Sequence, residues 1–199
     1  MRLLLAKMVR IALSLLCLFS TSIVYAGNSE HLLNISLGVI SEQWSVGVST
    51  HHRYRFALPV FIGIGLRAFH TSSWSEVQYT GVKGTSGSIA LSHPSSQSVN
   101  ALLEFGLQPL PDFELGMNID WIGLTVGPHK AGTHPSPFNL LLAGAHDKGT
   151  LNSEFYCGWR YRAIGFRMGL QHLIREIQQS GEHYRQGRNL LFIGLNFRI

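Results

Sequence analysis

The last stretch of the chain, Asn189 to Ile199, most constrains what the protein can fold into. Its residues alternate without a break between an apolar set and a mixed set of polar groups, glycine and two apolar residues; the apolar set is Leu191, Ile193, Leu195, Phe197 and Ile199. Successive side chains of a β-strand point to opposite faces, so one face of this strand is wholly apolar. An apolar outer face and a polar inner face are typical of a strand in a membrane β-barrel.

Seven earlier segments carry the same alternation, within residues 33–39, 44–55, 60–67, 99–107, 113–121, 154–162 and 166–171. Short connections near 57–59, 108–112 and 163–165 alternate with longer ones near 71–97, 127–152 and 176–188, and the first connection alone is brief. Outer-membrane barrels have an even number of strands, short periplasmic turns and longer external loops, whereas a soluble sandwich predicts no such alternation. We therefore predict an all-β fold, an eight-stranded antiparallel up-and-down transmembrane β-barrel.

The N-terminal segment predicts export. Basic residues at Arg2, Lys7 and Arg10 precede an apolar run, and a small-residue cleavage site ends at Ala26. Residues 1–26 are predicted to be a cleaved signal peptide and 27–199 the barrel domain. The predicted location is the bacterial outer membrane, with both termini in the periplasm.

Charge and cysteine content exclude several classes of protein. The net charge of +5 falls to about +2 without the signal peptide, where 13 Lys and Arg face 11 Asp and Glu. This balance gives no indication of nucleic-acid binding. The mature chain keeps one cysteine, Cys157, so it has no internal disulfide and no cysteine set for zinc. No metal or cofactor is predicted.

The polar faces of the segments combine glycines with charged side chains. The interior of an eight-stranded barrel is just filled by side chains, and charges away from water must be paired. We predict an ion-pair network that plugs the lumen; a general-acid role for its carboxylates is the alternative. The predicted members are Arg53, Arg55, Arg67, Glu104, Glu114, Asp120, Glu154, Arg160, Arg162, Arg167 and Arg198.

The start of the connection at 71–97 contains a possible catalytic set. His70 could act as base, Ser72 or Ser73 as nucleophile, and Glu76 as the orienting acid of a hydrolytic triad. The sequence from His70 to Ser72 resembles the H-x-S core of outer-membrane lipid A deacylases, which implies a lipid A ester hydrolase. A second, similar set follows His146.

Over the whole mature chain, the signal peptide, the eight alternating segments and the closing FIGLNFRI strand resemble small outer-membrane barrels of the OmpX, OmpA-barrel and opacity-protein type. The resemblance implies contact with outer-membrane lipid and lipopolysaccharide, and recognition of Asn189–Ile199 by the barrel-assembly machinery. That family usually ends in an aromatic residue, whereas this chain ends in Ile199, with Phe197 two residues earlier.

The preferred function is a surface protein without enzymatic activity. A rigid barrel would display the connections at 71–97 and 127–152 for adhesion, host interaction or envelope integrity, because loops on a rigid scaffold commonly carry binding. The lipid A hydrolase is the first alternative. A narrow channel for small solutes is the second, and it requires a water path through the charged lumen.

Overall fold

The structure, a computed structural model, describes residues 29–56, 59–127, 133–135, 138–140 and 149–199. The predicted signal peptide lies outside these residues, as do His146 and Asp147 of the possible second catalytic set, whose other members are Ser153 and Glu154. The described residues form twelve strands: β1 (Ser29–Ile40), β2 (Gln43–Arg55), β3 (Val60–Ser73), β4 (Glu76–Val82), β5 (Ser88–Ser92), β6 (Ser95–Leu110), β7 (Phe113–Val126), β8 (Thr133–Pro135), β9 (Phe138–Leu140), β10 (Gly149–Tyr161), β11 (Ile164–Gln179) and β12 (Glu182–Arg198).

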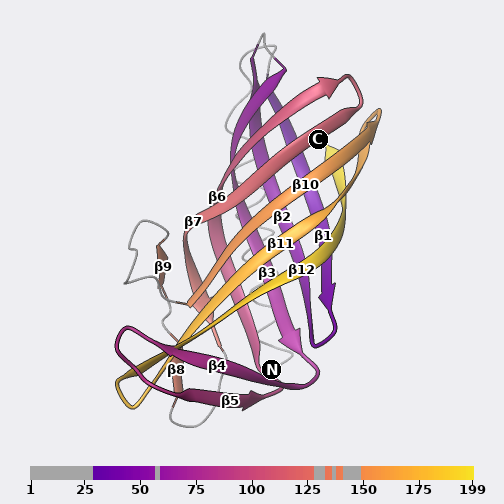
Figure 1. The fold of residues 1–199 in the computed structure, drawn as a ribbon. Coiled ribbons are helices and arrows are strands. Elements are labelled where there is room, and N and C mark those ends of the chain that lie inside the picture. Colours follow the sequence, from indigo (N-terminus) through magenta and orange to yellow (C-terminus); the bar gives the residue numbers. More distant parts are fainter. Residues whose placement is uncertain (1–28, 57–58, 128–132, 136–137, 141–148) are drawn as a thin grey trace.

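Eight of these strands close into an antiparallel barrel. The hydrogen-bonded order is β1, β2, β3, β6, β7, β10, β11 and β12, and β12 pairs with β1 from Leu32–Arg198 to Val39–Leu191. In Figure 1 the C-terminal end of β12 and the start of β1 lie together at one end of the barrel, opposite the β4–β5 hairpin. The predicted eight-stranded up-and-down barrel is confirmed, and with it the architectural part of the family resemblance.

The outside of the barrel is apolar over most of its height. The alternating residues predicted to face outward do so, and they include Leu191, whose exposed fraction is 67%. Other exposed members are Ile35, Leu37, Val46, Val48, Ile62, Ile64, Phe105, Leu115, Phe155, Met168 and Ile193. Soluble proteins rarely expose so large a continuous apolar surface, and a closed antiparallel barrel with this exterior has the pattern of a transmembrane β-barrel. We call this surface the apolar exterior.

A β-bulge in β7 explains why its alternation breaks after Trp121. Asp120 pairs with Leu102 and Ile122 pairs with Ala101, so Trp121 is the extra residue between them. Because a bulge shifts the side-chain period by one, even-numbered residues point inward before it and odd-numbered ones after it. Trp121 thereby stays exposed on the outside.

Two of the predicted loops are mostly strand. The region 71–97 contains the end of β3, the β4–β5 hairpin and the start of β6, and the region 176–188 is the continuous tip of β11 and β12. Ser180 and Gly181 alone form that hairpin turn, both with positive φ, as a two-residue type I′ turn requires. These strand segments are polar in sequence because they extend beyond the apolar exterior, so they lack the pattern that identified the others.

The β4–β5 hairpin is attached to the tip of β12. Three residue pairs, from His183–Val82 to Arg185–Thr80, join β4 to β12, and Figure 1 shows the hairpin crossing one end of the barrel. β8 adds to β11 and β9 to β7 at the same end. The sheet therefore continues past the barrel wall as an ordered layer. No helix among the described residues is long and apolar enough to cross a membrane.

We predict that an arginine on the apolar exterior destabilises the protein in lipid. Ile193→Arg on β12 should lower the free energy of unfolding by about 2–4 kcal/mol if it lies near the bilayer midplane, because the new charge faces hydrocarbon. Urea unfolding of the barrel in phospholipid vesicles measures this. Ser86→Arg, at the exposed β4–β5 turn, is the matched control and should change stability little. Equal effects of the two substitutions would contradict the membrane-embedded barrel.

Candidate functional site

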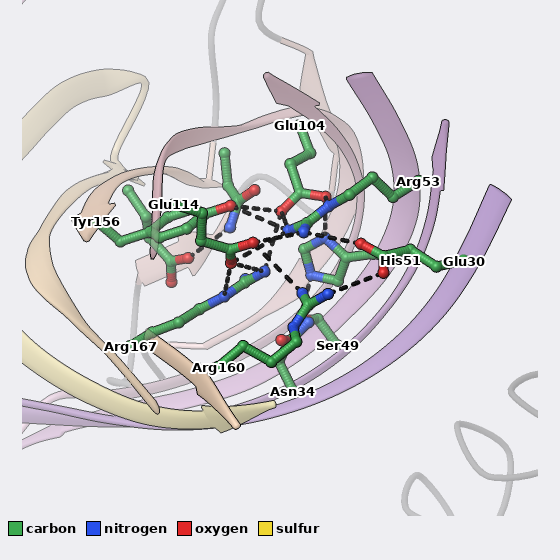
Figure 2. Close-up of polar contacts among 12 residues, drawn as sticks. Glu30, Asn34, Ser49, His51, Arg53, Glu104, Glu114, Tyr156, Arg160 and Arg167 are labelled. Atoms are coloured by element: carbon green, nitrogen blue, oxygen red, sulfur yellow. Dashed lines mark hydrogen bonds and ion pairs between the residues drawn. The ribbon is translucent and has the colours of Figure 1, made fainter. Parts of the chain in front are cut away.

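The lumen near the start of β1 and the C-terminal end of β12 holds a cluster of charged side chains centred on Arg53 (Figure 2). The side chain of Arg53 on β2 has no exposed surface and contacts three carboxylates. Its Nη1 lies 2.7 Å from Glu114 Oε2 and 3.0 Å from Glu30 Oε1, and its Nε and Nη2 donate to Glu104 at 3.1 and 2.8 Å. The guanidinium also lies 3.9 Å from the centre of the Phe61 ring.

Glu104 on β6 is the most enclosed of these carboxylates. Its Oε1 accepts hydrogen bonds from the Tyr156 hydroxyl at 2.7 Å and from Arg167 Nη2 at 3.3 Å. His51 Nδ1 lies 3.2 Å from its other oxygen, and the opposite ring nitrogen of His51 bonds to Ser49 at 2.8 Å. The carboxylate is therefore contacted from β2, β10 and β11, which together with its own strand β6 brings four strands around one group.

Glu30 and Glu114 extend the cluster toward the barrel end. Glu30 Oε1 pairs with Arg55 at 2.6 Å, and its Oε2 pairs with Arg160 at 2.8 Å. Arg160 also reaches Glu114 at 3.3 Å, and Glu114 accepts from Arg167 at 3.2 Å. These contacts connect β1, β2, β7, β10 and β11 across the lumen.

A second, smaller set of charges lies on neighbouring residues of the same inner face. Arg67 stands between Asp120 and Glu154, with nitrogen–oxygen distances of 3.5 and 2.8 Å. Asn100 donates to Asp120 at 2.7 Å, and Asn118 donates to Glu154 at 2.9 Å. A cavity of about 10 Å³, room for about one water molecule, lies beside Arg67, Asn118 and Glu154.

The charges within these two ion-paired sets are equal in number. The carboxylates of Glu30, Glu104, Glu114, Asp120 and Glu154 are matched in number by the guanidinium groups of Arg53, Arg55, Arg67, Arg160 and Arg167. A low-dielectric interior tolerates charges when they are paired and hydrogen-bonded, and this equality meets that condition.

Inward-facing glycines make room for the aromatic rings of the cluster. Gly116 is the cross-strand partner of Tyr156, and a Cβ on Gly116 would collide with the Tyr156 ring and hydroxyl. Gly106 has the same relation to Phe61. Each of these two inward-facing glycines therefore leaves room for an aromatic ring of the neighbouring strand to lie flat across it, as expected for a narrow barrel.

Two buried apolar clusters lie toward the opposite mouth of the lumen, among buried polar residues such as Ser73 and Arg175. Phe69, Leu173 and Leu190 form one buried cluster inside the barrel. Above it, Val77, Tyr79 and Leu91 of the hairpin pack with Ile177 of β11 in a second buried cluster. These two apolar clusters lie between the charged cluster and the exposed side of the hairpin.

The predicted hydrolytic set is not brought together. His70 and Ser72 lie on the outer face of β3, where the His70 ring packs 5.2 Å from the Trp44 ring. Ser73 points inward and is buried, and Glu76 is exposed on β4. His70 Nδ1 makes no hydrogen bond, and Glu76 lies on another strand. The strand period is the reason, since β3 continues through these residues and sends neighbours to opposite faces.

Two predicted lumen residues lie elsewhere. Arg162 is in the exposed turn after β10, with positive φ and its guanidinium 5.2 Å from the Tyr161 ring. Arg198 is at the rim; its side chain is 58% exposed and lies 4.0 Å from Glu30. The prediction of Arg162 as a lumen residue is wrong, because the turn ends the alternation one residue earlier.

Sequence reasoning missed three members of the cluster, Glu30, His51 and Tyr156. Glu30 lies on the same face of β1 as Asn34 and Gly38. Extending the first alternating segment toward the N-terminus would therefore have included it. His51 and Tyr156 are on polar faces, but neither is a charged residue at neutral pH. No three His, Cys, Asp or Glu side chains come together as a metal site in the part of the chain that the structure describes.

We predict that Arg53→Met lowers the free energy of unfolding by about 3–5 kcal/mol, because it leaves buried carboxylates without their main partner. Urea unfolding of the barrel in detergent micelles, followed by tryptophan fluorescence, measures the loss. Arg198→Met removes an exposed arginine and should change stability by less than about 0.5 kcal/mol. Similar losses for both variants would show that the buried pairs do not hold the barrel together.

Comparisons with known proteins return similarity in structure alone. No family model matches the chain, and no curated protein matches it. One similar structure is a designed protein from work titled "De novo design of transmembrane beta-barrels"; it has a TM-score of 0.39 and 8% identity, with 88% of this chain and 100% of that chain covered. Another is the Yersinia pestis outer membrane protein Ail in a phospholipid bilayer nanodisc, with a TM-score of 0.44, 10% identity, and 87% of this chain and 100% of that chain covered.

Proposed function

We propose that the protein is an integral outer-membrane barrel with a side-chain-plugged lumen, which displays an ordered sheet extension for adhesion or host contact. The observation that carries the proposal is the continuation of β11 and β12 beyond the apolar exterior, joined there by the β4–β5 hairpin. A binding surface built on strands of the barrel itself is rigid, and rigid scaffolds commonly position binding residues.

The apolar exterior supports the location. Its surroundings would be outer-membrane lipid and lipopolysaccharide, and the short connections at the terminal end would face the periplasm, as in outer-membrane barrels. The same proposal includes recognition of Asn189–Ile199 by the barrel-assembly machinery. Since these residues pair with β1 in the closed barrel, recognition must come before closure.

The contacts in the lumen support a plug rather than a channel. Arg53 and Glu104 have fully buried side chains in the middle of the barrel cross-section, and the apolar cluster of Phe69, Leu173 and Leu190 follows above them. A narrow channel would need a continuous polar path past both layers.

We predict that the folded protein gives no stepwise conductance in planar lipid bilayers at 100 mV. The paired charges and apolar layers leave ions no hydrated route. A large porin reconstituted in the same way is the positive control. Regular conductance steps from the protein, at a frequency that rises with its concentration, would favour the channel hypothesis instead.

Trp74 marks the outer surface of the display region. Its ring is 52% exposed, yet its Nε1 donates to the Ser41 carbonyl at 2.6 Å and its backbone N–H donates to the Glu42 carbonyl at 3.2 Å. Glu76 and Gln78 are exposed on the same hairpin. An exposed tryptophan held in one orientation is a typical anchor of a protein interface, because its large ring binds at low entropic cost.

We predict that Trp74→Ala weakens attachment of bacteria displaying this protein to host cells by fivefold or more. Attachment is counted on cultured epithelial cells, with the amount of folded barrel in the outer membrane held equal. Trp159→Ala is the matched control, since Trp159 is 59% exposed at the opposite end of the barrel. Unchanged attachment of the Trp74 variant, or equal loss in both variants, would overturn the assignment of this surface.

A further inference from the structure

Two histidines lie side by side on the outside of the barrel, near the end where β1 begins and β12 ends. His31 on β1 and His52 on β2 are cross-strand partners, and both side chains are partly exposed. Leu33, the next outward residue of β1, and Ile64, the partner of His52 on β3, are apolar. The pair of imidazoles therefore departs from the pattern that lipid contact imposes on this face.

The backbone brings the two rings as close together as a sheet allows. The carbonyl of His31 accepts a hydrogen bond of 3.0 Å from the N–H of Ile199, so the backbone groups of His31 point toward β12 and away from β2. His31 and His52 are thus a non-hydrogen-bonded pair, the kind of antiparallel pair whose side chains are closer. Their ring centres lie 4.5 Å apart, and the ring planes are inclined by 44°.

This spacing suits two imidazoles on one metal ion. With metal–nitrogen bonds of about 2.0–2.1 Å, two imidazoles at neighbouring coordination positions have ring centres about 4.5–5.5 Å apart. The observed separation of 4.5 Å falls at the start of that range. Rotation of the two side chains would therefore be enough to direct one nitrogen of each ring at a shared ion, without movement of the strands.

The ring of His52 is not held by a hydrogen bond from the described residues. Its Nδ1 is buried and has no hydrogen-bond partner. Nε2 is therefore the nitrogen left for a ligand that arrives from outside. The ring contact of His52 is with His31, so the same two side chains that lie closest together also supply the nitrogen donors.

The position of the pair along the barrel gives access from water. Ser29 and Tyr54 form the next outward pair toward the barrel end, and Tyr54 is exposed. Two residues of a strand advance by about 7 Å at most, so the histidines lie close to the edge of the apolar exterior. An ion and the water molecules around it can reach that edge from the aqueous side, which is the periplasm in the proposed orientation.

We propose that His31 and His52 form a two-histidine site for a divalent metal ion that prefers imidazole, such as Zn²⁺. Two ligands fixed on neighbouring strands bind as a chelate, which raises the affinity by about a hundredfold or more over one histidine. Structural and catalytic zinc sites have at least three protein ligands, so this ion would exchange, with water in its other positions. The site lies at the opposite end from the display surface, and its failure would leave that proposal intact.

The test is the unfolding temperature of the full mature barrel in a non-ionic detergent, titrated with zinc chloride. An ion that binds the folded state alone raises this temperature saturably. We expect such a rise for the wild type with Zn²⁺ and none with Mg²⁺, which prefers oxygen ligands. His52→Phe keeps an aromatic ring and removes one ligand, as does His31→Phe. Each should weaken the apparent zinc affinity by about tenfold or more, because the chelate is lost.

His172→Phe is the matched control. His172 is a partly exposed, outward-facing histidine of β11, and its Nδ1 lies 2.6 Å from Asn189 Oδ1. The variant should keep the zinc response of the wild type. Without zinc, all three phenylalanine variants should unfold close to the wild-type temperature, because each places an apolar ring on the apolar exterior.

A spectroscopic measurement counts the ligands directly. Cu²⁺ binds imidazole sites more tightly than Zn²⁺, and electron spin-echo modulation detects the imidazoles bound to it. The first equivalent of Cu²⁺ on the wild type should show two imidazoles, and one in His52→Phe.

The absence of a saturable response to Zn²⁺ would overturn the proposal, and so would equal zinc affinity in the wild type, His31→Phe and His52→Phe. Either result would leave the two rings as aromatic packing alone. If the phenylalanine variants do not fold, the copper spectrum of the wild type decides. Fewer than two imidazoles on the first bound Cu²⁺ would then refute the site.

Discussion

Charge neutralisation inside a narrow lumen is the constraint on which the rest of the structure depends. Eight strands enclose a space that side chains fill, so a charged residue that points inward meets other side chains rather than bulk water. Arg53 satisfies three carboxylates at once, and each of those carboxylates has further donors on other strands. The inward glycines follow from the same crowding, because rings such as Tyr156 need a neighbouring strand without side chains.

The sequence predicts the barrel well because lipid contact imposes a pattern of period two. The eight alternating segments coincide with parts of the eight barrel strands to within one residue at their ends, and the charged residues on their polar faces meet as expected for Arg53, Glu104 and Glu114. The specific partners could not be predicted, since strand tilt and stagger decide which levels face one another across the lumen. Glu30 was not predicted because the first alternating segment was taken to begin at residue 33, whereas β1 begins at Ser29.

The outer parts of the molecule were harder to predict for a physical reason. Beyond the apolar exterior, a strand can have polar residues on both faces, as at the tips of β11 and β12, and its sequence is then that of a loop. The same continuation of the strand places His70 and Ser73 on opposite faces. The catalytic interpretation assumed a loop, in which neighbouring side chains can converge, where the backbone continues as a strand that separates them.

The seam between β1 and β12 has a consequence for the time course of assembly. It joins the first and the last strand of the barrel, so it is the strand pairing with the greatest sequence separation. Glu30 on β1 reaches Arg160 on β10 only across a closed ring. Closure and dehydration of the charged cluster are then one cooperative step. A barrel assembled in this way opens slowly once sealed, because opening the seam would rehydrate many paired charges together.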